Sequence, residues 1–238
     1  MNVFQINRII ALMKNLVNPV WSALNSVDQR LNIGDEEVSY FDSEVSPFVA
    51  MQDWCDEAQL NALEKLPSGR SWFVMREGGV KFIDDFVEVI TIPLYQMVCK
   101  DFKSNLLSDV DVRLLGEEHL ESMLSITGLT KPGPFMSRTI EFGNYKGLFV
   151  GDRLVSMAGE RLHVEGYTEV SAVCTHPNQL GKGFGAHMLS ILSADVLAKG
   201  NIPFLHVRQD NKRAIGMYER LGFEVSREIF FAIFRMLS

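Results

Sequence analysis

One short stretch of this chain restricts its fold more than any other, because a strand, a glycine-rich loop and a helix follow one another directly. Residues 168–175 alternate in polarity as a β-strand does. Gly181, Gly183 and Gly185 then open a segment whose apolar residues have helical spacing. Glycines let backbone approach a ligand closely, and free N–H groups at a helix N-terminus bind anions. We therefore expect this loop to hold a phosphate-bearing ligand.

The segments after this helix complete an α/β pattern. Residues 204–207 form a buried type of strand, and Asn211 is suited to cap a helix that ends at Gly222. Residues 223–236 form a last β segment. A strand–helix–strand–helix–strand order predicts an α/β fold with a mixed sheet.

Two well-known phosphate-binding motifs fit the glycine loop poorly. A dinucleotide fingerprint needs its glycines directly after the strand and an acidic residue about 20 positions further on. Here a proline-containing stretch intervenes, and residues 204–208 carry no acidic residue. A Walker loop needs a Lys-Ser or Lys-Thr pair after its last glycine, and none follows Gly185. The sequence disfavours both a dehydrogenase and a nucleotide triphosphatase.

Three motifs in order resemble the GNAT superfamily of acyl-CoA N-acyltransferases. The segment Leu180–Gly185 is similar to its acyl-CoA loop, although Leu180 replaces the usual Gln or Arg and so removes one side-chain contact to phosphate. Residues 211–223 (Asn-xx-Ala-xxx-Tyr-xxx-Gly-Phe) resemble its second motif, and residues 171–177 resemble the strand before the loop. The match covers residues 110–238 and is most like the glycine-N-acyltransferase-like branch.

The resemblance implies a GNAT fold with a mixed, splayed central sheet, and acetyl-CoA as the acyl donor. Main-chain groups of Val173 and Thr175 would pair with the pantetheine arm, and a main-chain N–H there would polarise the thioester carbonyl. The residues that the resemblance implies for binding the donor are Val173, Cys174, Thr175, Leu180, Gly181, Lys182, Gly183, Phe184, Gly185, Ala186, Asn211 and Tyr218.

N-acylation needs a deprotonated amine and a proton for the leaving thiolate. Glu169 lies where some family members carry a base, and strict alternation would place it on the same face as Val173 and Thr175; a solvent-facing glutamate is the alternative. Tyr218 matches the family's usual general acid, with a core tyrosine as the alternative. Alternation turns Cys174 away from Glu169, which favours a small buried residue over a cysteine nucleophile.

The chain divides into two halves at a polar stretch over residues 100–111. We expect a support half or degenerate GNAT-like half over residues 1–108, and a catalytic N-acetyltransferase domain over residues 109–238. The first half carries a predicted helix over residues 53–66 and a predicted hairpin over residues 72–83, and it shows no catalytic constellation.

Composition narrows the partners. The net charge of −7 and a pI near 5.3 argue against nucleic-acid binding, which needs a basic surface. Three scattered cysteines suggest neither a disulfide framework nor a metal site, so we expect a reducing compartment, the cytoplasm. Residues 1–17 form a basic amphipathic segment that packs on its own domain or a dimer mate, or else lies on a membrane surface; we expect no membrane insertion.

The sequence therefore predicts transfer of an acetyl group from acetyl-CoA to a primary amine by direct attack. The alternative is a non-catalytic acyl-CoA-binding or regulatory module, in which the loop binds its ligand without chemistry. The sequence leaves open the amine acceptor, the acyl-chain preference, a homodimer and the role of the first half.

Overall fold

The computed structural model describes residues 13–80 and 86–236 of the chain. Its central feature is one eight-stranded sheet with strand order β3-β10-β4-β9-β8-β7-β6-β5. β8 and β9 run parallel, and the other neighbouring strands run antiparallel. The strands are β3 (Trp72–Arg76), β4 (Phe86–Cys99), β5 (Asp111–Leu114), β6 (Lys146–Val150), β7 (Arg153–Val164), β8 (Tyr167–Thr175), β9 (Ile202–Arg208) and β10 (Phe223–Met236).

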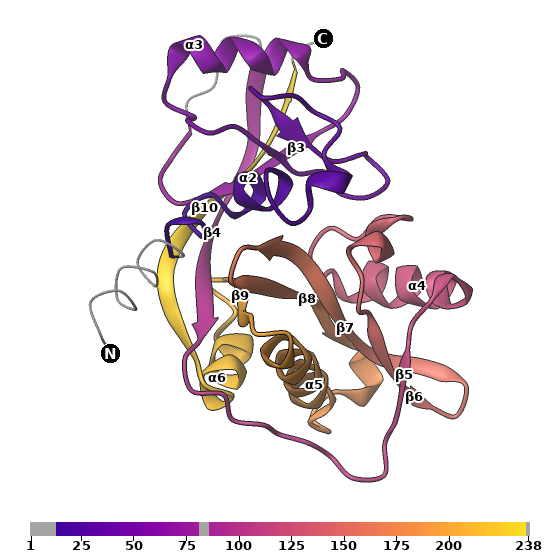
Figure 1. Ribbon diagram of the computed structural model, residues 1–238. Helices are drawn as coiled ribbons and strands as arrows, with labels where there is room; N and C mark the ends of the chain where they lie inside the picture. Colours follow the sequence, from indigo (N-terminus) through magenta and orange to yellow (C-terminus); the bar gives the residue numbers. More distant parts are fainter. Residues whose placement is uncertain (1–12, 81–85, 237–238) are drawn as a thin grey trace.

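Helices cover both faces of this sheet (Figure 1). α5 (Phe184–Ala198) and α6 (Lys212–Arg220) pack on one face, in a core built from residues such as Met188, Leu192 and Ile215. α2 (Pro19–Leu24) and α4 (Leu120–Thr130) pack on the opposite face. This arrangement confirms the predicted α/β class with a mixed sheet.

The helix that follows β9, α6, begins and ends as the sequence predicts. Asn211 Oδ1 accepts a hydrogen bond from the Ala214 N–H at 3.1 Å and so caps α6. Gly222 closes the other end with φ +89°, and a Cβ atom there would lie 1.8 Å from the Asp101 carbonyl oxygen. Only glycine fits this position, because both the left-handed backbone and the close contact exclude a side chain.

Strand β4 joins the two halves of the sequence within one sheet. It pairs with β10 over nearly its whole length, and its residues Leu94–Val98 also pair with β9. Figure 1 shows β4 and β10 together running from the lower part of the molecule into the upper part. The boundary expected at residues 108 and 109 therefore crosses a continuous sheet, because β9 would lose one neighbour and β10 would lose two.

The polar stretch expected to be a linker is tied to the second half. The Asn105 N–H donates to Ser190 Oγ at 2.9 Å, and the Leu107 N–H donates to His187 Nδ1 at 2.9 Å. Both acceptors lie on α5. Residues 103–108 thus form a strap across that helix.

The rest of the first half is small. β1 (Ser39–Tyr40) and β2 (Val49–Ala50) form a separate two-stranded sheet, the only one within residues 13–80 and 86–108. The helix predicted over residues 53–66 is shorter, with α3 (Glu57–Leu60) followed by a 3₁₀ turn over Asn61–Lys65. β3 pairs with β10, whereas most of its predicted hairpin partner lies outside the described residues.

Most of the amphipathic segment predicted over residues 1–17 lies outside the described residues. In the part of the chain that the structure describes, no helix has both the length and the apolar character needed to cross a membrane.

A buried ionic cluster connects the first half to β7. The Asp28 carboxylate accepts from the backbone N–H of His163 at 2.8 Å and lies 2.9 Å from its Nδ1, while Glu160 lies 3.0 Å from Nε2. Lys199 donates to Glu160 as well. Burial by itself would lower the pKa of His163, but its two carboxylate partners raise this pKa to about 9.

We predict that Asp28→Asn destabilises the fold more at pH 6 than at pH 9.5. Because the folded pKa of His163 lies above its unfolded value of about 6.5, its contribution is complete below pH 6.5 and is lost as pH rises through 9. The expected cost at pH 6 is about 1 to 3 kcal/mol. Urea unfolding midpoints at both pH values measure it.

Glu165→Gln, an exposed change in the turn after β7, is the matched control and should move neither midpoint. An Asp28→Asn penalty that is equal at both pH values would show that His163 is not charged in the folded protein.

Candidate active site

The site begins where two parallel strands separate. β8 pairs with β9 only through Tyr167, Thr168 and Glu169. Beyond that point Val173–Thr175 of β8 and His206–Arg208 of β9 line opposite sides of a cavity of about 1280 Å³. A strand edge without a neighbour leaves main-chain donors and acceptors available to a ligand. The splayed sheet predicted from the sequence is therefore present, and the cavity lies at its opening.

The glycine loop closes one end of this cavity. Gly181 and Gly183 have φ near +80°, a conformation that side chains rarely adopt. Gly183 precedes the first residue of α5, and no side chain caps that helix. The first N–H groups of α5 therefore remain free to bind an anion at the cavity.

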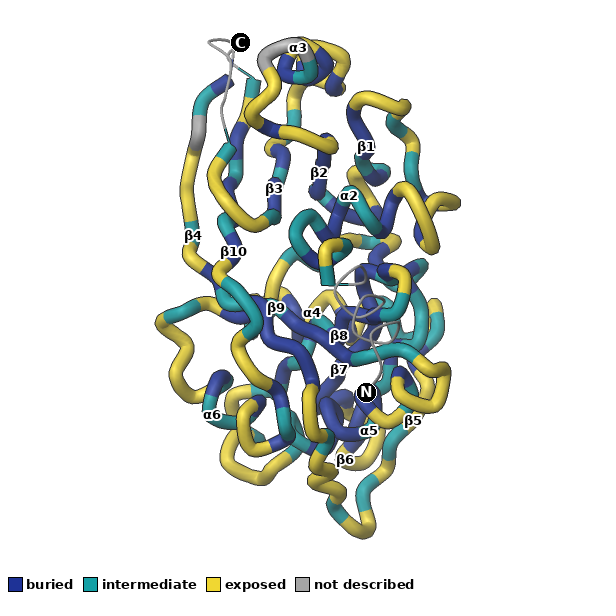
Figure 2. Tube along the Cα trace, turned by 60° about the vertical axis from the view of Figure 1, so that its left-hand side comes forward, coloured by how far each residue is buried: buried dark blue, intermediate teal, exposed yellow. Residues whose placement is uncertain are grey.

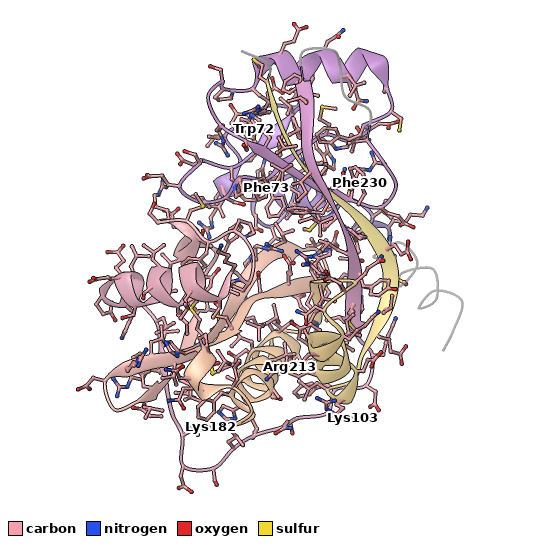
Figure 3. All side chains as sticks on the ribbon, turned by 180° about the vertical axis from the view of Figure 1, so that it is seen from behind. Trp72, Phe73, Lys103, Lys182, Arg213 and Phe230 are labelled. Atoms are coloured by element: carbon pink, nitrogen blue, oxygen red, sulfur yellow. The ribbon has the colours of Figure 1, made fainter. Side chains whose placement is uncertain are left out.

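Most residues predicted to bind the donor meet at this one cavity. Its lining includes Val173, Cys174, Thr175, Leu180, Gly181, Gly183, Phe184, Gly185, Ala186, Asn211 and Tyr218. Lys182 is the exception, because its Nζ donates to Gln179 Oε1 at 2.7 Å and its side chain does not line the cavity. In Figure 3, Lys182 and Arg213 lie close to the beginnings of α5 and α6, with Lys103 on the neighbouring strap.

Tyr218 reaches the cavity from α6. It is 8% exposed, and within the described residues its hydroxyl has no hydrogen-bond partner. Burial raises the pKa of Tyr218 to about 12. The phenol therefore stays protonated at neutral pH and is able to donate a proton to a group in the cavity.

Glu169 occupies a different position from the one predicted. It is 1% exposed, and its carboxylate accepts from Arg161 Nε at 2.7 Å, Arg161 Nη2 at 2.6 Å and His206 Nδ1 at 2.7 Å. Burial alone would raise the pKa of Glu169, but Arg161 and His206 outweigh it and lower the pKa to about 2. Direct contact between Glu169 and an amine does not agree with this geometry, because partners occupy both oxygens and the side chain does not line the cavity.

The reason is a β-bulge that simple alternation does not anticipate. Met157 pairs with Cys174 and Gly159 pairs with Ser171, so β8 carries one extra residue there, and Ala172 has φ +52°. The extra residue reverses which face each later side chain occupies. Cys174 packs in the same core as Phe48, the ring on which Arg161 lies, whereas Val173 packs toward α5. The predictions that Glu169 shares a face with Val173 and Thr175, and that Cys174 faces away from Glu169, were wrong.

Several cavity residues carried no recognised sequence signal. Arg161 and His206 line the cavity where the strands separate, and Phe48 and Met75 reach it from the first half. Simple hairpin pairing across the turn at Glu165 and Gly166 would place Leu162 opposite Glu169, and only a second register shift, between Glu160 and His163, brings Arg161 beside Glu169. The described residues hold no cluster of His, Cys, Asp or Glu able to bind a metal.

Comparisons with known proteins agree with this geometry. A family model described as FR47-like protein matches residues 145–232. A structure from Novosphingobium aromaticivorans DSM 12444, assigned to the GNAT family of acetyltransferases, is 27% identical, covers 94% of this chain and 99% of its own, and superposes with a TM-score of 0.85. A GCN5-related N-acetyltransferase from Kribbella flavida is 15% identical, with coverages of 92% and 94% and a TM-score of 0.64. No curated protein matches the chain.

In its fold the chain is similar to these two GNAT-type structures over nearly its whole length. The findings support the superfamily and do not support the narrower glycine-N-acyltransferase-like branch.

Cys174 lines the cavity but has the chemistry of a buried thiol. Burial raises its pKa to about 11, although Thr130 and the backbone of Met157 partly counteract this. We predict that Cys174→Ala keeps kcat within about threefold, because a thiol with so high a pKa supplies little thiolate at neutral pH. Steady-state kinetics and intact mass after incubation with acetyl-CoA measure this.

The exposed Cys55 supplies the comparison for thiol reactivity. Iodoacetamide at neutral pH is expected to label Cys55 much faster than Cys174. An acetyl group trapped on Cys174 would overturn the prediction and favour a two-step mechanism.

Proposed function

We propose that this protein transfers an acetyl group from acetyl-CoA to a primary amine by direct attack. The observation that carries the proposal is the shared cavity, which brings an open strand edge, the free N-terminus of α5 and the Tyr218 hydroxyl together. The amine nitrogen forms a bond to the thioester carbon, the carbon–sulfur bond breaks, and the thiolate takes a proton from Tyr218; the nitrogen releases its extra proton to water, and Tyr218 regains a proton from water.

The charges of the cavity suit the donor. Five cationic side chains line it, whereas no aspartate or glutamate of the described residues does; the cations are Lys131, Arg161, Arg208, Arg213 and Arg220. The phosphates of coenzyme A are anionic, so we assign them to the end where Arg213 lies beside the start of α6. Leu180 adds only apolar contact there, and the backbone of the loop remains the main phosphate ligand.

The same charges bear on the acceptor. A cationic surrounding disfavours an ammonium group, so an amine binds here as its free base. The enzyme then needs no carboxylate that touches the amine, which is consistent with the buried ion pairs of Glu169. We assign Glu169 a positioning role, in which it holds Arg161 and His206 at the cavity wall.

We also propose that the protein lies in the cytoplasm. Cys55, Cys99 and Cys174 are all free thiols in the structure, and unpaired cysteines suit the reducing cytoplasm.

Binding of acetyl-CoA is tested by thermal denaturation. At about 100 times its Kd, acetyl-CoA would stabilise the fold by about 2.7 kcal/mol, which raises Tm by several degrees. We predict that Gly183→Asp removes this shift, because a carboxylate at the start of α5 repels the phosphates.

Gly200→Asp is the control, because Gly200 has φ +81° and so imposes the same backbone strain outside the cavity. It is expected to lower Tm while it keeps the acetyl-CoA shift. Absence of any shift in the unmodified protein with acetyl-CoA, longer acyl-CoAs or free coenzyme A would sink the assignment.

Turnover is tested by the pH dependence of kcat/KM. We predict an acidic limb that follows the pKa of the amine, because only the free base attacks. Two acceptors of different basicity should shift the limb by the difference between their pKa values, and Glu169→Gln should keep this shift. An acidic limb whose pKa does not change with the acceptor, and that disappears in Glu169→Gln, would show instead that Glu169 is the base.

Tyr218→Phe completes the test. We expect a loss in kcat of about tenfold, at or below the low end of general acid catalysis, because a thiolate needs little help to leave. Since the pKa of Tyr218 is about 12, this loss should be constant between pH 7 and 10. Acetyl-CoA binding without transfer to any amine would favour the non-catalytic binding module.

A further inference from the structure

The end of the cavity next to Arg161 and Phe48, which we call its inner end, has a mostly apolar wall. Its side chains come from the first half and from the ribbon of β4 and β10, and they are Phe48, Met75, Ile92, Leu94 and Phe231. Apolar walls favour an apolar group by roughly 25 cal/mol for each Å² removed from water. Phe48 and Met75 are only 1% exposed, so the surface open to a ligand is mainly that of Ile92, Leu94 and Phe231.

A charged group, Arg161, interrupts this wall beside His206. Arg161 is held by its Nε and Nη2 atoms on Glu169, and its guanidinium carbon lies 5.1 Å from the centre of the Phe48 ring. Its side chain is 9% exposed. Nη1 has no hydrogen-bond partner within the described residues, and it would lie 4.0 Å from a Cβ atom added at Gly133, which also lines the cavity.

A guanidinium nitrogen that no protein group pairs with needs a water or a ligand oxygen to accept its hydrogen bond. Because Glu169 fixes the rest of the group, Nη1 points in one direction and is already positioned for an oxygen atom. The wall thus combines one fixed donor with apolar side chains, and it offers no anion to a second ammonium group.

We propose that the acceptor is an amine that carries two groups close to its nitrogen. One is a large apolar group, and the other is a carboxylate or carbonyl oxygen. Arg161 Nη1 donates to that oxygen, and the apolar group packs against the side of Ile92, Leu94 and Phe231 that lines the cavity. This inference rests on the proposed function, since it names the acceptor of the same site. It disfavours glycine, polyamines and simple alkylamines.

The experiment compares probe amines at equal concentrations of free base, so that differences in amine pKa cancel. L-Phenylalaninamide and L-phenylalanine carry both features, 2-phenylethylamine lacks the oxygen, L-alaninamide lacks the large apolar group, and spermidine adds cations. We expect kcat/KM for the better of the first two to exceed each of the others by about tenfold or more. The first pair also separates a carbonyl oxygen from a carboxylate. A preference for spermidine, or equal rates with 2-phenylethylamine, would overturn the proposal.

Two variants test the two features separately. Arg161→Lys keeps the charge beside Glu169 but removes Nη1, so the ratio of kcat/KM for phenylalaninamide to that for 2-phenylethylamine should fall to about one. Arg153→Lys, outside this cavity, is its control. Ile92→Trp fills the apolar space and should lower kcat/KM for phenylalaninamide at least about tenfold, with little effect on alaninamide. Val89→Trp, exposed on the same strand, is its control. If Arg161→Lys fails to fold, the selectivity of Ile92→Trp decides, and no change in that selectivity overturns the proposal.

Direct binding distinguishes this inference from the proposed function. Calorimetry with phenylalaninamide and protein saturated with free coenzyme A reads acceptor binding without turnover. Binding that depends on Arg161 and Ile92 would support the acceptor class even if no acetyl group were transferred. Transfer to another amine, with no binding of phenylalaninamide or phenylalanine, would leave the enzyme activity standing and overturn the acceptor class.

Discussion

The structure depends on the separation of β8 from β9, and the buried ion cluster of Arg161, Glu169 and His206 lies where that separation occurs. Glu169 is the last residue of β8 that pairs with β9. Its side chain binds Arg161 on β7 and His206 on β9, so one carboxylate connects three strands. Charges of this kind gain little net stability, because desolvation offsets much of their attraction. What they provide here is position, since the strands are held together up to Glu169 and are free to part beyond it.

The cluster also explains why the first half of the sequence belongs to the site. Arg161 lies against Phe48, and β4 supplies Gln96, whose amide nitrogen lies 3.1 Å from His206 Nε2. In Figure 2 the strands around this point, β7, β8 and β9, are mostly buried, whereas β4 has exposed positions in its upper part. Residues 109–238 by themselves would lack β4 and the inner wall of the cavity. The first half is therefore a structural part of the site, although its sequence carries no catalytic motif.

Local sequence patterns predicted the loop and helix that border the cavity well, and its contacts with the first half poorly. The glycine loop and the capped helix of Asn211 are short-range signals, and short-range geometry decides them. The faces of β8 were mispredicted because one extra residue near Ala172 reverses the alternation, and nothing in its composition marks a bulge. Phe48 and Met75 were missed because their place at the cavity depends on long-range pairing within the sheet, which one sequence does not reveal.

The cavity differs in charge from the chain as a whole. The chain carries a net charge of −7, yet cationic side chains line the cavity and its nearest carboxylate, Glu169, is neutralised by its partners. An acidic exterior with a cationic cavity attracts an anionic donor into one place and disfavours it elsewhere. On the proposed function, coenzyme A phosphates would balance the cations near α5 and α6, and no free carboxylate of the described residues would line the cavity to hold an ammonium group. The basicity of the acceptor itself, rather than an enzyme carboxylate, would then set the lower pH at which the proposed reaction proceeds.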